Sequence, residues 1–176
     1  MKKKDIRIMP QYFDRYIALA DDNLTVTDAL ELSLLELEKA PIDKWKALGS
    51  NVYAAGKWTL CDMLQHILDT ERIFVYRILS IARGDQQTMA PFEEDDFARN
   101  AMANRRSFQE ILEEMKLVRK TTIMMFKSFN EDMLLRNGSG NNGVQYGPLA
   151  LGFVLAGHQR WHFRVLEERY YPLVED

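Results

Sequence analysis

Residues 59–85 read TLCDMLQHILDTERIFVYRILSIARGD, and this stretch decides the fold. Its apolar residues recur at every third or fourth position, which is the period of an α-helix with one buried face. Thr59 and Asp62 form a capping box at its start, in which a hydroxyl and a carboxylate bind the unpaired N–H groups of the first turn. Gly84 ends the pattern, because glycine commonly follows a helix. The stretch therefore predicts one long amphipathic helix.

The rest of the chain predicts three more helices of this kind. A capping box at Thr25 and Asp28 opens a helix that stops before Pro41. A third helix carries an apolar stripe from Phe108 to Phe129, close to the 3.6-residue period. A fourth runs from Gly147-Pro148, with proline in its first turn, to Tyr171-Pro172.

The segments between these helices are expected to be long connections without regular structure. They are a loop from Pro41 to Trp58, a linker from Gly84 to Phe97 whose acidic part Glu93–Asp96 is solvated, and a glycine-rich loop over Asn137–Gly143. About 14 linker residues span up to about 46 Å, which exceeds the ~36 Å length of a 24-residue helix. The chain has room to return along the bundle, so the third helix can run parallel to the second.

Four amphipathic helices bury their apolar faces best against one another. The fold class expected is all-α: an up-down-down-up four-helix bundle with long interhelical connections. No repeat or domain boundary is visible, so a single bundle domain over residues 1–176 is expected, with residues 1–10 as an N-terminal arm.

Composition excludes several classes of protein. The chain is 47% hydrophobic, which is too apolar for a disordered protein, and its net charge of −3 predicts no nucleic-acid partner. No apolar run reaches the ~18 residues of a membrane span, and the basic N-terminus lacks the apolar segment of a signal peptide. Cys61 is the single cysteine, so an intramolecular disulfide is excluded. We expect a cytoplasmic protein without a membrane partner.

The three histidines are the candidate functional residues. His158 and His162 lie four residues apart on the apolar face of the fourth helix, a spacing that offers two metal ligands one turn apart. Two histidines that only form hydrogen bonds in the core would show the same spacing, and the two interpretations carry equal weight. His66 lies at the edge of the apolar face of residues 59–85 and could converge on the pair. Three imidazoles would leave a fourth metal position open. Asp62 is an alternative partner of His66, but its capping role explains it better.

Two charged residues also interrupt apolar stripes. Glu71 lies on the buried face of residues 59–85, and Arg119 lies on that of the third helix. An isolated buried charge costs several kcal/mol, so we expect the two to form an ion pair. A structural pair that fixes the register of the two helices is favoured over a substrate-anchoring pair beside a cavity.

The sequence resembles a known family, the DinB-like superfamily. The matching segments are GKWT at residues 56–59, LQHILDTER at 64–72, Tyr76-Arg77, ARGD at 82–85, AGHQRWH at 156–162 and ERY at 168–170. The resemblance extends from about Tyr12 to Pro172. It implies an up-down-down-up bundle, commonly a homodimer, in which His66, His158 and His162 hold a divalent metal ion. Zinc or nickel is expected.

The resemblance also implies two activities on an unknown small-molecule substrate. Relatives include metal-dependent hydrolases and S-transferases that use a low-molecular-weight thiol as cofactor. A third interpretation is a non-catalytic, metal-binding dimeric bundle. At Gln159 and Trp161 this chain lacks a carboxylate and an additional imidazole that relatives often carry. No catalytic base and no cofactor-binding residue is therefore assigned.

Overall fold

Three of the four long helices in the computed structural model, which describes residues 1–174, begin at capping boxes. The Thr25 hydroxyl accepts from the Asp28 N–H at 3.2 Å, and the Asp28 carboxylate accepts from the Thr25 N–H at 3.1 Å. The box that begins at Thr59 has the same arrangement. A third box joins Ser107 and Glu110. The sequence analysis missed it, although the Ser-x-x-Glu spacing is its signal.

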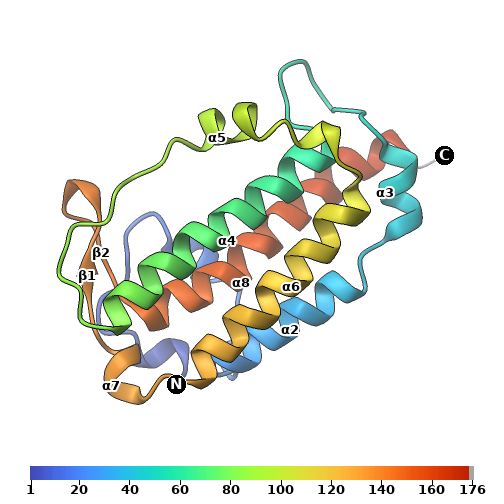
Figure 1. The fold of residues 1–176 in the computed structure, drawn as a ribbon. Coiled ribbons are helices and arrows are strands. Elements are labelled where there is room, and N and C mark those ends of the chain that lie inside the picture. The colour runs from blue at the N-terminus through green and yellow to red at the C-terminus, as the bar shows by residue number, and fades with distance from the viewer. Residues whose placement is uncertain (175–176) are drawn as a thin grey trace.

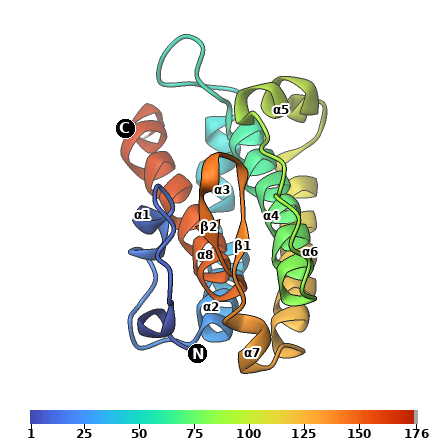
Figure 2. The same cartoon turned by 90° about the vertical axis from the view of Figure 1, so that its left-hand side faces the viewer.

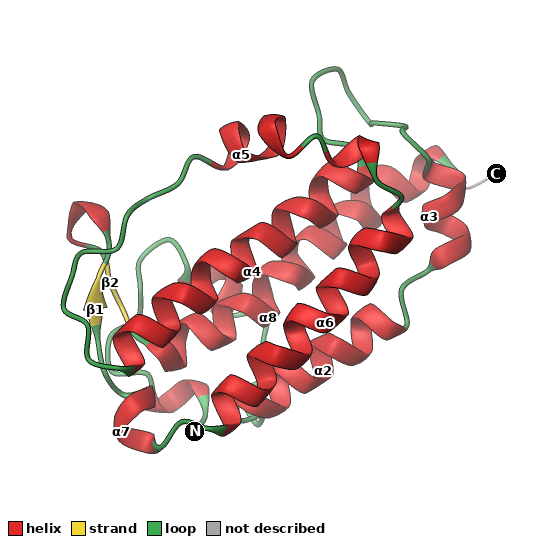
Figure 3. Ribbon diagram, in the orientation of Figure 1, coloured by secondary structure: helices red, strands yellow, loops and turns green. Residues whose placement is uncertain are grey.

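The elements follow one another as helices with one small hairpin. In chain order they are α1 (Asp14–Ile17), α2 (Val26–Glu38), α3 (Ile42–Leu48), α4 (Leu60–Ala82), α5 (Glu94–Ala101), α6 (Phe108–Lys127), α7 (Glu131–Leu134), β1 (Gly138–Ser139), β2 (Gln145–Tyr146) and α8 (Pro148–Val165). Short 3-10 turns span Lys3–Asp5, Ala103–Arg105, Asn141–Gly143 and Tyr171–Leu173, and a π-helical turn, Leu166–Tyr170, extends α8. Figure 3 shows how strongly helices dominate.

Helices α2, α4, α6 and α8 form the predicted four-helix bundle. Both α2 and α4 pack against α6 and α8. In Figure 1, α2 and α8 run toward the end of the bundle that carries α3, whereas α4 and α6 run toward the end that carries α7. Contacts in the same order along both segments agree with these directions: Ser33–Gln159 and Glu36–Arg160 for α2 and α8, and for α4 Gln65–Arg106, just before α6, and Arg72–Glu114 within α6.

The connections contain more regular structure than expected. The predicted loop 41–58 includes α3, because Ile42, Trp45 and Leu48 recur at helical spacing and the last two are fully buried. The predicted linker 84–97 includes the start of α5, whose first turn carries Glu94, a position where negative charge stabilises a helix. The expectation of irregular structure was wrong in both places.

Two further differences lie near the bundle ends. The glycine-rich loop contains β1 and the 3-10 turn Asn141–Gly143, and β1 pairs with β2 in an antiparallel register that sets Gly138 opposite Tyr146. Helix α6 ends at Lys127, so Phe129 packs on the core from beyond the helix. The Met89 N–H donates to the Ser139 carbonyl at 2.8 Å, which attaches the α4–α5 linker to the hairpin. The linker and the hairpin run side by side in Figures 1 and 2.

The N-terminal segment lies against the bundle. The Met1 carbonyl accepts from the Val26 N–H at 2.9 Å, and α1 packs along α8, next to which it lies in Figure 2. A Cβ on Gly157 would overlap the backbone oxygen of Tyr16, so only glycine permits this close approach. The approach brings the Tyr16 ring to the middle of α8.

A polar layer divides the core into two apolar clusters. One cluster includes Leu30, Phe74, Ile123 and Ala156, and the other includes Leu37, Leu68, Met115 and Leu166. Between them lie buried polar side chains from all four bundle helices, among them Ser33, Glu71, Arg119 and Gln159. The candidate site lies at the level of this layer. None of the helices within residues 1–174 is both long enough and apolar enough to span a membrane.

Candidate metal centre

The three histidines of the sequence meet at one point between α4 and α8. The Nε2 atom of His158 lies 3.1 Å from that of His66 and 3.0 Å from that of His162. Their ligand atoms all lie within 4.8 Å of one another. His66 and His158 are buried, at 5% and 6% exposure, and His162 is partly buried. Convergence of three imidazoles from two helices is the arrangement that the sequence predicted.

Burial keeps all three imidazoles neutral at physiological pH. It lowers the pKa of His66 to about 4. Burial and the nearby His66 lower the pKa of His162 to about 3. Burial, followed by the neighbouring histidines and Arg119, holds the pKa of His158 well below its usual range. A neutral imidazole has a free lone pair, which is the form that binds a metal ion.

The donor set fits a divalent ion. Two nitrogens that bind one zinc ion at about 2.0–2.1 Å stand roughly 3–3.4 Å apart, and the two measured Nε2 separations agree with this. The Nε2 atom of His158 faces two other Nε2 atoms, yet its ring nitrogen carries at most one hydrogen. Three converging lone pairs are more completely satisfied by a cation than by one another. Imidazole nitrogen suits zinc, nickel, copper and iron.

Aromatic rings hold the three imidazoles in place. The Trp58 ring lies 4.7 Å from that of His66 and stacks on that of His162 at 6.5 Å. Tyr16 meets His158 edge-on at 5.2 Å. Because such contacts restrict rotation of the imidazoles, the Nε2 atoms are directed at one another before any ion binds.

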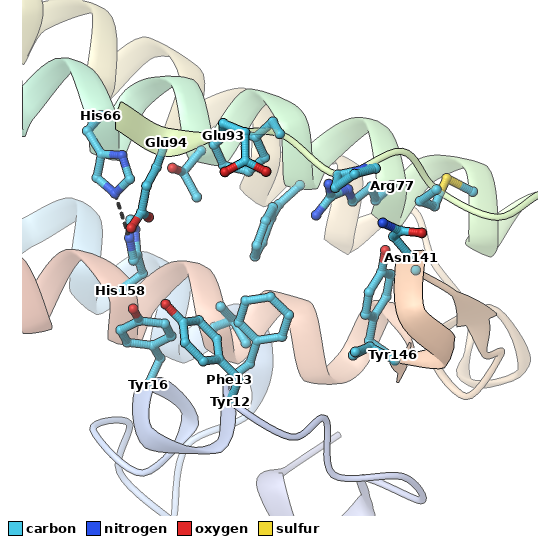
Figure 4. A pocket seen from close by; sticks show the side chains of 18 residues that line it. Tyr12, Phe13, Tyr16, His66, Arg77, Glu93, Glu94, Asn141, Tyr146 and His158 are labelled. Carbon is cyan, nitrogen blue, oxygen red and sulfur yellow. Dashed lines mark hydrogen bonds between the residues drawn. The ribbon is translucent and has the colours of Figure 1, made fainter. Parts of the chain in front are cut away.

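A cavity of about 340 Å³ opens beside this cluster. His66 and His158 form part of its wall, together with Tyr16 from α1 and Glu94 from α5. Figure 4 shows Glu94 directed toward the two histidines, with Tyr16 on the other side. Burial, followed by the neighbouring Tyr12, raises the pKa of Tyr16 to about 12, and Glu94 adds the smallest contribution. A carboxylate and a neutral phenol therefore lie beside the histidines.

Glu94 was missed by the sequence analysis. The acidic run Glu93–Asp96 was interpreted as a solvated linker, and its side chains are indeed exposed. Glu93 and Glu94 nevertheless line the cavity, because the linker crosses its mouth before α5 begins. No local pattern signals this, since the path of the linker is set by contacts with the distant hairpin.

The expected pair of Glu71 and Arg119 is confirmed. Arg119 Nε and Nη2 donate to the two Glu71 carboxylate oxygens at 2.8 and 2.9 Å. Thr122 donates to the same carboxylate at 2.8 Å, and Arg119 also contacts the Ser33 hydroxyl. This network joins α2, α4 and α6. Neither charged residue lines the cavity, which favours the structural interpretation of the pair.

The two positions where relatives carry other residues have structural roles here. The Gln159 side chain points toward α2, where its amide donates to the Ser33 carbonyl at 2.9 Å and to Glu36 at 3.2 Å. Trp161 packs edge-on against Tyr16 at 5.7 Å. Asp62 accepts from Thr59 and from the Asn104 amide, in keeping with its capping role.

The chain is similar to a known family in sequence and to a solved structure in fold. The family model described as the DinB superfamily matches residues 15–166. No curated protein matches the chain. Among solved structures, YfiT from Bacillus subtilis superimposes with a TM-score of 0.75 and 12% sequence identity, covering 96% of this chain and 91% of that chain. YfiT is described as "a probable metal-dependent hydrolase with an unusual four-helix bundle topology". At 12% identity, this likeness establishes the fold.

Proposed function

The chain belongs to the DinB superfamily, and from that premise we propose that it is a small-molecule hydrolase that uses a divalent metal ion held by His66, His158 and His162. One observation carries the proposal: three imidazoles converge beside a 340 Å³ cavity, and two of them, His66 and His158, line its wall. A divalent ion held by these three imidazoles would supply Lewis-acid chemistry that activates water. The description of YfiT as a metal-dependent hydrolase supports the proposal.

The cavity wall supplies the remaining chemistry. The Tyr16 hydroxyl stays protonated, because its pKa is raised to about 12, and it can donate a hydrogen bond to an oxygen of the substrate. Glu94 supplies the carboxylate that accepts a proton from the attacking water.

Metal content tests the ligand set directly. Wild-type protein, the His158→Ala variant and the Thr70→Ala variant are each loaded with zinc or nickel, dialysed and analysed by mass spectrometry. Thr70 is a matched control, because it lines the same cavity and its buried hydroxyl has no hydrogen-bond partner among residues 1–174. We expect about one ion per chain in wild type and Thr70→Ala, and at least a tenfold loss in affinity for His158→Ala. Equal metal content in all three proteins would contradict the ligand assignment.

Hydrolysis tests the reaction. Metal-loaded protein is assayed against a panel of small esters and amides, and the activity is expected to vanish with a chelator and to return with zinc or nickel. Glu94→Gln is expected to lower kcat by about 10²–10⁴-fold while metal content stays unchanged. Asp96→Asn, a neighbouring exposed carboxylate of α5 outside the cavity wall, is the control and keeps its activity. Activity that survives chelation would rule out the metal-dependent mechanism.

A thiol S-transferase is the second candidate, because the three histidines border two cavities. A second cavity of about 330 Å³ is lined by His162, Trp58 and Tyr53, whereas His66 and His158 line the first. Two spaces beside one metal suit a reaction of a low-molecular-weight thiol with an electrophile. A metal ion held by the three histidines would keep such a thiol in its thiolate form.

Spectroscopy separates the two candidates. Titration of the Co(II)-loaded protein with low-molecular-weight thiols produces thiolate-to-metal charge-transfer bands if a thiol binds the metal. A flat spectrum would exclude the transferase and leave the hydrolase. Charge-transfer bands without hydrolysis of any ester or amide would favour the transferase. If both assays are negative and metal binds, the non-catalytic bundle remains.

A further inference from the structure

The end of the first cavity that lies away from the histidines holds a buried guanidinium without a carboxylate partner. Arg77 lies in α4, eleven residues after His66, and is 7% exposed. Its Nη2 atom donates to the Ala90 carbonyl at 2.6 Å. Among residues 1–174, this is its one hydrogen bond, and the structure records no ion pair for it. A guanidinium has five N–H donors, so most of them lack a partner.

Such a placement is costly unless an anion binds there. Burial lowers the pKa of Arg77, yet an arginine remains protonated in proteins. The nearest compensation comes from the rings of Phe74 and Phe92, whose centroids lie 5.2 and 5.8 Å from its guanidinium carbon. Arg119, the other buried arginine, has a bidentate carboxylate instead. A buried charge without a counter-ion is unfavourable, and a bound anion would offset that cost.

Two further donors lie at the same end of the cavity. The Tyr146 ring and the Asn141 side chain line the wall next to Arg77 in Figure 4. Burial raises the pKa of Tyr146, so its hydroxyl keeps its proton and can donate. A guanidinium, a phenol and an amide together match the acceptor oxygens of a carboxylate or a phosphate.

The cavity is elongated, and its two ends differ in charge. Eleven helical residues separate His66 from Arg77, which corresponds to about 16 Å along α4. Phe13, Phe74 and Val154 contribute apolar wall. Glu94 points toward the histidine end in Figure 4, and neither it nor Glu93 forms an ion pair with Arg77. An anionic group is therefore favoured at the Arg77 end and disfavoured beside the Glu94 carboxylate.

We propose that the substrate is an elongated small molecule with an apolar body and a terminal carboxylate or phosphate, which Arg77 binds at the end remote from the histidines. This inference rests on the proposed hydrolase function, since it specifies the substrate of that site. A rigid guanidinium fork pairs with both kinds of oxyanion in a bidentate way. Arg77 thus selects substrates with a negative charge and determines which bond of the substrate lies beside the histidines.

Binding of matched probes tests this inference without any turnover. The probes are 4-phenylbutanoate and its uncharged amide, 4-phenylbutanamide, and 3-phenylpropyl phosphate distinguishes a phosphate from a carboxylate. Calorimetry is carried out on metal-loaded wild type and on the variants Arg77→Met, Arg83→Met and His158→Ala. Arg83 is the matched control, because it is an exposed arginine at the end of the same helix. His158→Ala removes metal binding of the carboxylate as an explanation.

We expect the carboxylate to bind at least about tenfold more tightly than the amide in wild type, Arg83→Met and His158→Ala. The ratio falls to about one in Arg77→Met, while the amide still binds and so reports an intact cavity. A ratio near one in wild type, a ratio that persists in Arg77→Met, or no binding of either probe at about 10 mM would overturn the inference. Failure of the hydrolase proposal can be distinguished from failure of this inference, because metal content and turnover test the hydrolase proposal.

Discussion

At the scale of single residues, the bundle contains two buried arginines in opposite surroundings. Arg119 is 1% exposed and has a bidentate carboxylate, whereas Arg77 has one backbone acceptor and faces a cavity. The carboxylate that pairs with Arg119 is Glu71, which comes from a neighbouring helix. The same side chain therefore serves a structural role in one place and is available to a ligand in the other.

Removal of one member of the buried pair is expected to destabilise the fold. Arg119→Met leaves the Glu71 carboxylate buried without its counter-ion, which costs about 3–5 kcal/mol of unfolding free energy. Urea denaturation monitored by circular dichroism measures the loss. Arg72→Met, which breaks a half-exposed pair with Glu114, is the control and costs less than about 1 kcal/mol.

The double variant Glu71→Leu/Arg119→Met refines this prediction. It removes both charges and restores apolar packing, so it is expected to be more stable than Arg119→Met alone. Similar losses of unfolding free energy in Arg119→Met and Arg72→Met would show that an unpaired buried charge is not the cause of the destabilisation.

At the scale of elements, α1 is positioned by a single glycine of α8. The Tyr16 backbone crosses α8 at Gly157, directly before His158, and the ring of Tyr16 contacts that histidine. Trp161 also contacts the Tyr16 ring edge-on. The short helix therefore forms part of the site, although it lies outside the bundle.

Gly157→Ala is expected to displace α1 and to cost about 1–3 kcal/mol or more of stability, because the new methyl group overlaps rigid backbone. Thermal denaturation measures the stability, and limited proteolysis shows whether residues 10–22 have become accessible. Gly152→Ala is the matched control on the same helix. Its Cβ meets side-chain atoms of Val26 and Phe126 and no backbone of α1, so a protected N-terminal segment is expected. Equal effects of the two variants would refute the role of Gly157.

At the scale of the whole molecule, the polar layer is where the four helices are held to one another by polar contacts. Glu71, Arg119 and Ser33 link three helices, and the histidines link α4 to α8. A metal ion at the histidines would add a cross-link between α4 and α8 at the same level. Metal binding is therefore expected to stabilise the entire fold.

Metal removal tests this linkage. At a metal concentration about 100-fold above Kd, binding adds about 2.7 kcal/mol to the unfolding free energy, so a chelator is expected to lower the Tm by several degrees. The His158→Ala variant, whose metal affinity is reduced, is expected to show little change with the chelator. An identical response of the two proteins would mean that the chelator acts elsewhere.

The homodimer stays a prediction. Leu117 and Met124 of α6 are 63% and 71% exposed, and they stand seven residues apart on one face of the helix. We expect light scattering to give twice the mass of one chain and Leu117→Lys to reduce it to the mass of one chain. A wild-type protein that elutes with the mass of a single chain would contradict the prediction.

Some of the architecture was accessible from local patterns. Helix periodicity and the Thr25 and Thr59 capping boxes predicted the bundle helices, because both signals depend on residues within a few positions of one another. Helix α3 was missed since Pro41 and Gly49 bracket it closely, although the burial of Trp45 stabilises it. Short helices of this kind depend on tertiary packing more than on their own propensity.

The sequence by itself determined which polar residues fall on buried helix faces. His158 and His162 share one side of α8 by spacing alone, and Glu71 and Arg119 on apolar stripes were expected to pair, because isolated buried charges are costly. Only the tertiary structure decided what surrounds these residues. Glu94 and Arg77 belong to one cavity because the linker is attached to the hairpin, a contact between segments about fifty residues apart. Local patterns cannot encode such a contact, since its free energy exists only once the bundle has formed.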